Sequence, residues 1–152
     1  MSGTYSKIYL HFVVNVEAKK NLLPNDYSDD ICMYFTGTVQ GLNFGHKMIR
    51  INCVPDHVHF LVGYRPSQSI SDFMRDVKSA VSKYINSQRW MRFRFSWMEG
   101  YGCFSVGPED LDRVCRYIDN QKEHHQRNSF DEEYRNLLRK YDIIYNPKYF
   151  LK

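Results

Sequence analysis

The sequence lacks several features that mark whole classes of protein. No apolar run approaches the roughly 18 residues that a membrane-spanning helix needs, and there is no low-complexity segment or internal repeat. None of the four cysteines forms a Cys-x-x-Cys pair, and no secretory signal sequence precedes them. These absences argue against a membrane protein, a repeat protein and a structural zinc module, and they predict reduced, mostly buried thiols in a cytoplasmic protein.

The remaining composition is typical of one globular domain that is rich in aromatic residues. At 152 residues the chain is long enough to bury a hydrophobic core. Aromatic side chains make up 16% of the residues, which fits either a large aromatic core or a surface on which nucleic-acid bases stack. The formal net charge of +4 is compatible with nucleic acid but is weak support by itself.

The stretch from Pro55 to Gly63 is the most informative part of the sequence. It predicts a β-strand, and because side chains alternate across a strand, His57 and His59 share one face. Two imidazoles side by side on a rigid strand are suitable ligands for a divalent metal. Taken alone, however, such a pattern is more often a half-buried strand with two incidental histidines.

Hydrophobic periodicity elsewhere predicts the element order β-α-β-β-α-β, which is the ferredoxin-like or RRM-like α+β arrangement of an antiparallel sheet. The predicted elements are a strand at 8–16, a helix at 26–42 capped by Asn25 or Asp26, strands at 48–54 and 57–62, a helix at 69–87 capped by Ser69 or Ser71, a strand-like segment at 89–97 and a short strand at 101–106. Ile49, Ile51 and Cys53 are expected on one face of their strand. Because the first and third strands are central neighbours in this arrangement, His11 is expected beside the histidine pair.

Additional helices are expected after this core. Residues 108–124 predict a helix on which Tyr117 and Gln121 lie one turn apart, with His124 near the same row. A capping box at 129–132 predicts a last helix that ends near residue 141, followed by an aromatic tail. We therefore expect a single domain over 1–152, with its core at about 5–106, the helix of Tyr117 at about 108–124, and a C-terminal helix and tail at about 129–152.

Combining Tyr117 and Gln121 with the histidine pair suggests a specific chemistry. Two imidazoles and one amide oxygen would hold Mg²⁺ or Mn²⁺ with positions open for a phosphate oxygen. A phenol has a pKa of about 10 and needs activation by a metal or a base before it attacks. Attack by Tyr117 on a phosphodiester would give a phosphotyrosine and free a hydroxyl, and this covalent bond would let another DNA end reverse the step without ATP.

These motifs resemble those of the HUH-superfamily single-tyrosine transposases of small bacterial insertion sequences and the related REP-associated tyrosine transposases. The matching stretches are 9–16, 55–62, 97–106 with its Gly-Tyr-Gly-x-Phe-Ser-Val segment, and 117–121, in the family's order over nearly the whole chain. The segment 15–20 departs from the basic run that many relatives carry after the first strand.

The resemblance implies a DNA transposase with an RRM-like core that cleaves and rejoins single-stranded DNA. It assigns Tyr117 as the nucleophile of a 5′-phosphotyrosine intermediate, and His57, His59 and Gln121 as ligands of Mg²⁺ or Mn²⁺. It also implies recognition of DNA hairpins at element ends, and a homodimer. Whether Tyr117 serves the histidine pair of its own chain or of a partner is left open.

Binding of single-stranded DNA needs a basic groove with stacking surfaces. The candidates are Arg89, Trp90, Arg92, Arg94, Lys78 and Lys83, with Lys47 and Arg65 as extensions. For each of these residues, ordinary solvated surface charge is an equally good interpretation. His11 and His124 are expected as active-site neighbours.

Three other functions remain compatible with these patterns. The least favoured is a metal hydrolase, which would need an activated water rather than a tyrosine. A domesticated relative would process palindromic DNA without mobilising its own gene. An RRM-like module would bind nucleic acid without catalysis, although the sheet-face aromatic motif typical of such modules is not evident.

Overall fold

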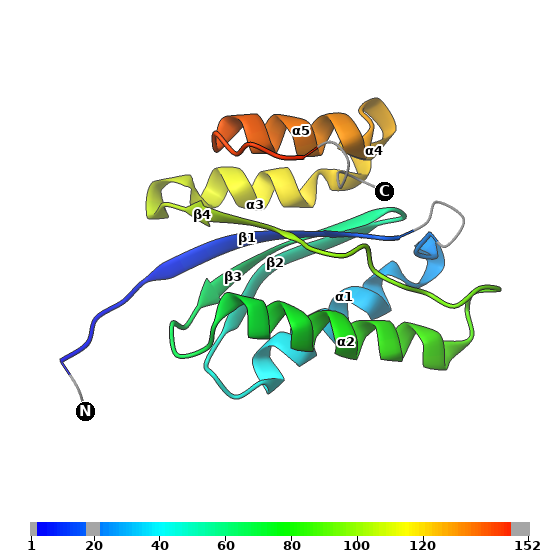
Figure 1. Cartoon of the computed structure of the whole chain (residues 1–152), viewed down its shortest axis with the longest axis horizontal. Coiled ribbons are helices and arrows are strands. Elements are labelled where there is room, and N and C mark those ends of the chain that lie inside the picture. Colours follow the sequence, from blue (N-terminus) through cyan, green and yellow to red (C-terminus); the bar gives the residue numbers. More distant parts are fainter. Residues whose placement is uncertain (1–2, 18–21, 147–152) are drawn as a thin grey trace.

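The computed structural model describes residues 3–17 and 22–146 of the chain. Its strands are β1 (Ile8–Asn15), β2 (Lys47–Val54), β3 (His57–Tyr64) and β4 (Gly102–Val106). Its helices are the short η2 (Asn25–Tyr27), α1 (Ser28–Gly41), α2 (Ile70–Gln88), the short η3 (Pro108–Asp110), α3 (Leu111–Asp119), α4 (Gln121–Arg127) and α5 (Phe130–Lys140). Figure 1 shows the sheet between two helical layers, with α1 and α2 on one face and α3, α4 and α5 on the other.

The four strands form one antiparallel sheet in the order β2-β3-β1-β4. The predicted α+β arrangement is confirmed, including the central position of β1 and β3. Alternation along β1 directs Leu10, Phe12 and Val14 into the core under α1 and α2, whereas His11 and Val13 face the opposite layer. The face covered by α3, α4 and α5 therefore has β1 and β3 at its middle rather than at an edge.

Helix α2 forms for the reasons that its sequence predicts. Ser69 is its N-cap, and the Ser69 hydroxyl accepts a hydrogen bond from the backbone N–H of Asp72 at 3.1 Å. Phe73 and Val77 of its apolar stripe are fully buried against the sheet. The predicted cap of α1 is wrong, because the 3₁₀ turn at 25–27 precedes that helix and no side chain caps its first residue.

The strand predicted at 89–97 is absent from the sheet. Arg89 ends α2 in a left-handed conformation with φ of 59°. The segment that follows pairs with the strand region through an isolated β-bridge between Trp97 and Val16. The free edge of β1 is instead taken by β4. Phe95 of this segment is nevertheless buried in the core, which accounts for the apolar position that suggested a strand. Its backbone N–H donates to Asn86 Oδ1 at 2.7 Å rather than to a neighbouring strand.

A register shift between Met48 and Arg50 changes the faces of β2. Ile51 and Cys53 pack against the core under α1 and α2, whereas Ile49 packs with Ile118 on the opposite face. The prediction that Ile49 shares a face with Ile51 and Cys53 is therefore wrong. A bulge inserts one residue and inverts the alternation on one side of it, which periodicity alone does not reveal.

The helix predicted over 108–124 is divided into η3, α3 and α4, with a break at Asn120. The side chain of Asn52 on β2 explains the break, because its Nδ2 donates to the carbonyl oxygens of Ile118 at 2.9 Å and Asp119 at 3.3 Å. The capping box is confirmed, since Ser129 Oγ accepts from the backbone N–H of Glu132 at 3.2 Å.

Two smaller expectations concern the cysteines and the tail. All four cysteines are free thiols, and Cys53 is the fully buried one. Tyr145 of the tail packs on the cluster formed by α5 and β4, while Tyr149 and Phe150 lie outside the described residues. Within residues 3–17 and 22–146, no helix has both the length and the apolar character that crossing a bilayer requires.

Candidate active site

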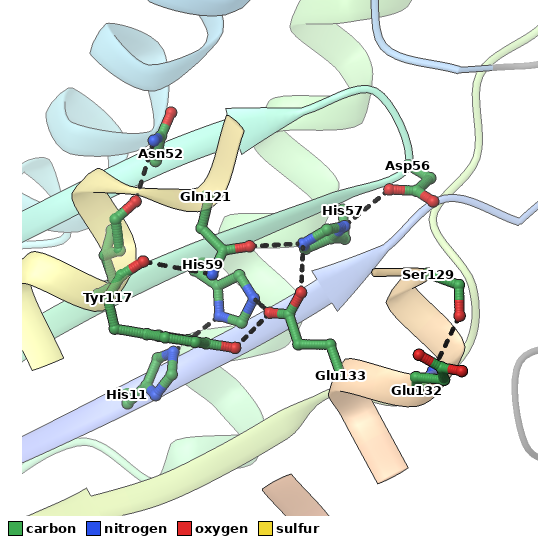
Figure 2. A network of polar contacts seen from close by, with 11 residues as sticks. His11, Asn52, Asp56, His57, His59, Tyr117, Gln121, Ser129, Glu132 and Glu133 are labelled. Carbon is green, nitrogen blue, oxygen red and sulfur yellow. Dashed lines mark hydrogen bonds and ion pairs between the residues drawn. The ribbon is translucent and has the colours of Figure 1, made fainter. Parts of the chain in front are cut away.

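His57 and His59 lie on the face of β3 that is covered by α3, α4 and α5. Both side chains are completely buried, and Val58 and Phe60 point into the opposite core. The predicted shared face of the two histidines is confirmed. Figure 2 shows that they meet side chains from β1, α3, α4 and α5.

His59 connects two neighbours through its two ring nitrogens. Its Nδ1 lies 2.8 Å from His11 Nε2, and its Nε2 lies 2.6 Å from Glu133 Oε1. Burial lowers the pKa of His59 to about 4, despite the opposing effect of the Glu133 carboxylate. Burial and the nearby His59 also hold the pKa of His11 well below its usual range. At neutral pH, neutral His11 therefore donates its Nε2–H to His59, and neutral His59 donates its Nε2–H to Glu133.

Glu133 is the acceptor at the centre of this network. Burial by itself would raise its pKa, but the hydrogen bond from His59 and the electrostatic influence of both strand histidines lower the pKa to about 2. Its Oε1 accepts from His59 and from the hydroxyl of Tyr117. Its Oε2 is buried and has no hydrogen-bond partner among the described residues, and it lies 3.8 Å from His57 Nε2. The carboxylate is thus ionised at neutral pH and half satisfied.

His57 is oriented from both sides of its ring. Its Nδ1 lies 2.7 Å from Asp56 Oδ1, and its Nε2 lies 3.0 Å from Gln121 Oε1. The amide nitrogen of Gln121 donates to the carbonyl oxygen of Tyr117 at 3.4 Å, which turns its oxygen toward His57. A carboxylate on the outer nitrogen of a histidine fixes the ring orientation in many metal sites.

Tyr117 extends from α3 over the same cluster. Its ring centroid lies 5.4 Å from that of His59 and 5.3 Å from that of His124. Burial, followed by the adjacent negative charge of Glu133, raises the pKa of Tyr117 well above its ordinary value of 10.0. The phenol is therefore protonated in this arrangement. Tyr117 therefore lies in one cluster with His57, His59 and Gln121 of the same chain.

The ligand atoms of the cluster suit a divalent metal. One atom from each of His57, His59 and Glu133 can be chosen so that all three lie within 4.8 Å of one another, and Gln121 Oε1 adjoins them. Carboxylate and amide oxygens are ligands of Mg²⁺ and Mn²⁺, and imidazole nitrogens are common ligands of divalent transition metals. The buried oxygen of Glu133 that lacks a donor gives a cation a further partner, so these residues fit a metal ion.

A cleft of about 290 Å³ opens beside Tyr117 and Glu133. His11 and His124 line it, so the structure places both predicted neighbours beside the phenol. Arg113, Lys140, Asn128 and Asn136 also line the cleft. The cleft therefore places cationic and amide side chains next to the phenol. Cationic side chains bind phosphate, and amide side chains bind the edges of bases.

The basic patch predicted from sequence lies elsewhere, on the side of the sheet covered by α1 and α2 (Figure 1). Lys78 donates to the carbonyl oxygens of Met98 and Gly100 at 2.9 and 2.7 Å, and Trp90 stacks on Tyr27 with 4.2 Å between ring centroids. The structure does not bring these residues to Tyr117. A role in DNA binding stays a prediction for the set Arg89, Trp90, Arg92, Arg94, Lys78 and Lys83.

Sequence reasoning missed two members of the cluster, Asp56 and Glu133. Asp56 directly precedes the histidine strand, and nothing in its local sequence marks it as a partner of His57. Glu133 follows the capping box that predicts α5, and its signal is a carboxylate on the buried side of that helix, between Phe130 and Leu138. This signal becomes informative only once the helix is known to cover the histidine pair.

Comparison with known proteins agrees with the resemblance seen in the sequence. Residues 4–121 match the family described as "Transposase IS200 like". A curated relative, the ISDra2 transposase TnpA of Deinococcus radiodurans, is 27% identical over 82 residues, which cover 51% of this chain and 59% of that protein. The chain therefore matches little more than half the length of this relative.

Solved structures share the fold. A crystal structure from Deinococcus radiodurans R1, described as a transposase, aligns with a TM-score of 0.61 and 22% identity over 80% of this chain and 95% of the other. A REP-associated tyrosine transposase bound to a REP hairpin aligns with a TM-score of 0.60 and 14% identity over 82% and 73%. The family match spans most of the chain and includes the His57–His59 strand and the segment from Tyr117 to Gln121. The chain therefore belongs to the IS200-like transposase family, within the HUH superfamily of single-tyrosine transposases.

Proposed function

We propose that this protein is a transposase that cleaves and rejoins single-stranded DNA, with Tyr117 as nucleophile and with Mg²⁺ or Mn²⁺ bound by His57, His59 and Gln121. The observation that carries the proposal is the convergence of the Tyr117 hydroxyl and the two imidazoles around one buried carboxylate. Family membership supports a transposase of this class. The cytoplasm is the proposed location of such a reaction.

The proposed reaction exchanges one phosphate ester for another. Tyr117 Oη attacks the phosphorus of a DNA phosphodiester, the bond to the 3′ oxygen breaks, and the released strand ends in a 3′-hydroxyl. The phosphate stays on Tyr117 as a 5′-phosphotyrosine. The 3′-hydroxyl of another DNA end then attacks the same phosphorus, which restores the phenol and rejoins the DNA.

The surrounding residues prepare the phenol for this reaction. Glu133 accepts the hydrogen bond of the Tyr117 hydroxyl and so fixes the direction of its oxygen. The phenol must lose its proton before or during attack, and because burial and the adjacent Glu133 charge raise the pKa of Tyr117, the reaction needs a base or a metal ion to activate the hydroxyl. A bound divalent cation would stabilise the negative charge that develops on the phosphate.

The proposed DNA partner is a single strand with hairpins at the ends of an element. One solved structure of the same fold is a REP-associated tyrosine transposase bound to a REP hairpin, and the cleft beside Tyr117 carries Arg113 and Lys140 for contacts to phosphate. The homodimer implied by the family resemblance remains part of the proposal. The proximity of Tyr117 to the histidine pair of its own chain favours a reaction within one chain.

The first test is formation of the covalent intermediate. The full chain, incubated with Mg²⁺ and a labelled single strand that carries a hairpin end, should give a protein–DNA adduct that survives denaturing electrophoresis. Tyr117→Phe should abolish the adduct, and His57→Ala should lose the metal-dependent adduct while its circular dichroism spectrum stays that of the wild type. An adduct that persists in Tyr117→Phe would show that another residue is the nucleophile.

The same experiment separates the alternative functions. DNA binding without any adduct, unchanged by EDTA and by Tyr117→Phe, would favour an RRM-like binding module. Adduct formation on palindromic DNA, together with the absence of paired hairpin ends around the gene, would favour a domesticated palindrome-processing relative.

A further inference from the structure

We propose that Glu133 is a direct ligand of the metal ion in this site, contributed by a helix that lies beyond the family match. The inference rests on the proposed function in one respect, because it assumes that a divalent cation binds at His57 and His59. Residues 4–121 match the family, and Glu133 follows twelve residues after that match ends. Its assignment therefore depends on this chain's own structure.

The first observation is the state of the two carboxylate oxygens. Oε1 of Glu133 is fully used, since it accepts from His59 Nε2 and from the Tyr117 hydroxyl. Oε2 is buried without a hydrogen-bond partner among the described residues. An ionised oxygen that is removed from water without a donor is strongly destabilising. A cation is the partner that would satisfy it.

The second observation is the chemistry of the atoms around Oε2. It lies 3.8 Å from His57 Nε2, which lies 3.0 Å from Gln121 Oε1. When His57 donates its Nδ1–H to Asp56, its Nε2 presents a lone pair toward these two oxygens. Three electron-pair donors then face one another, and a divalent cation between them turns this repulsion into coordination.

The third observation is the rigidity of the helix that presents Glu133. Ser129 caps the start of α5, and the ring of Phe130 stacks on that of His57 with 4.1 Å between centroids. Leu138 on the next turns is buried against Val13 and Phe104. The carboxylate is therefore held in place by packing and does not depend on a loop.

A purely structural role is the competing explanation. Glu133 would then serve only to hold His59 and Tyr117 through Oε1. That role would make the protein less stable when Glu133 is changed, and it would also lower the affinity for metal, because partners that orient a metal ligand influence binding. A loss of affinity therefore shows that Glu133 belongs to the metal site, and the position of the bound ion relative to Glu133 distinguishes the two explanations, with no need for DNA or for turnover.

The experiment is a titration of the full metal-free chain with Mn²⁺, followed by calorimetry and by the electron paramagnetic resonance signal of free Mn²⁺. Glu133→Gln keeps the size of the side chain and removes its charge. Glu132→Gln is the matched control, because Glu132 is the exposed neighbour whose side chain points away from the cluster (Figure 2). His57→Ala reports whether the metal binds at the histidine pair at all.

We expect Glu133→Gln to weaken Mn²⁺ binding by at least about tenfold, since even the outer partners of metal ligands change affinity by roughly 10- to 100-fold. Glu132→Gln should bind as the wild type does. Equal affinity of Glu133→Gln and wild type, with binding lost in His57→Ala, would overturn the role of Glu133 and leave the proposed function intact. Absence of Mn²⁺ binding in the wild type would overturn both.

A crystal structure of the wild-type chain with Mn²⁺ provides a test that does not depend on how a variant folds. Anomalous scattering should locate the ion within bonding distance of a Glu133 oxygen. An ion bound by His57, His59 and Gln121 with Glu133 out of reach would contradict the proposal.

Discussion

The two faces of β3 are buried equally but are organised by different forces. Val58 and Phe60 on one face, and His57 and His59 on the other, are all completely buried. The first pair enters an aromatic and aliphatic core under α1 and α2, where packing is non-directional. The second pair meets Asp56, Gln121, Glu133 and His11, and each contact requires a donor and an acceptor in register.

This difference suggests that the two faces contribute to different properties of the protein, one to stability and the other to function. A polar atom buried on the apolar face without a hydrogen bond would be destabilising, but the apolar side chains there need no specific hydrogen-bond partner. The polar face gathers its members from β1, α3, α4 and α5 around β3, and one carboxylate oxygen there has no hydrogen-bond partner in the described part of the chain. Stability should therefore respond most to changes on the apolar face, and metal binding and pH dependence to changes on the polar face.

The largest effect on stability is expected from Phe60→Ala. Phe60 is fully buried, with its ring centroid 5.2 Å from that of Phe12 and 5.4 Å from that of Phe35. Removing such a ring should lower the free energy of unfolding by about 3–5 kcal/mol, as measured by urea denaturation. Phe130→Ala on the polar face is the companion variant and should cost less, because Phe130 is 7% exposed. An equal or larger loss in Phe130→Ala would contradict the assignment of stability to the apolar face.

The second effect is a loss of stability in acid that originates on the polar face. Burial lowers the pKa of His59 from 6.5 to about 4, so the unfolded chain binds a proton before the folded one does. The associated stability is fully present above pH 6.5 and is lost as the pH falls toward 4. It amounts to roughly 3 kcal/mol, and His11, whose pKa is also lowered, adds loss in the same direction.

Glu133 extends this loss to lower pH. Its folded pKa of about 2 lies below the ordinary 4.5, so the stability that it contributes is present above 4.5 and disappears as the pH falls toward 2. Urea denaturation at a series of pH values should show a continuous decline that begins near pH 6.5. His59→Gln should flatten the part between pH 6.5 and 4, and an unchanged slope in this variant would place the titrating groups elsewhere.

The smallest loss of stability is expected from removing either of the two N-cap side chains. Ser69 caps α2 on the apolar side, and Ser129 caps α5 on the polar side, at 3.1 and 3.2 Å from their partner N–H groups. Ser69→Ala and Ser129→Ala should each cost about 1 kcal/mol of unfolding free energy. Only Ser129→Ala should also weaken Mn²⁺ binding, because α5 positions Glu133. Equal Mn²⁺ affinity in both variants would show that the cap does not influence the site.

Much of the fold follows from local patterns. Alternation in β1 and β3 correctly places His11, His57 and His59 on one face, because the period of a strand is set by the backbone. The stripe and cap of α2 are also correct, since both are encoded within one or two turns. The failures at 89–97, Ile49 and Asn120 share a cause, because in each case a contact from a distant segment overrides the local pattern.

The sequence by itself determined the β-α-β-β-α-β order, the shared face of the two histidines and the family to which the chain belongs. Only the tertiary structure decided that Tyr117 lies beside the histidine pair of its own chain and that Glu133 joins them. The reason is physical: 74 residues separate His59 from Glu133. No local propensity encodes that contact, which exists because α5 packs its buried side over β1 and β4.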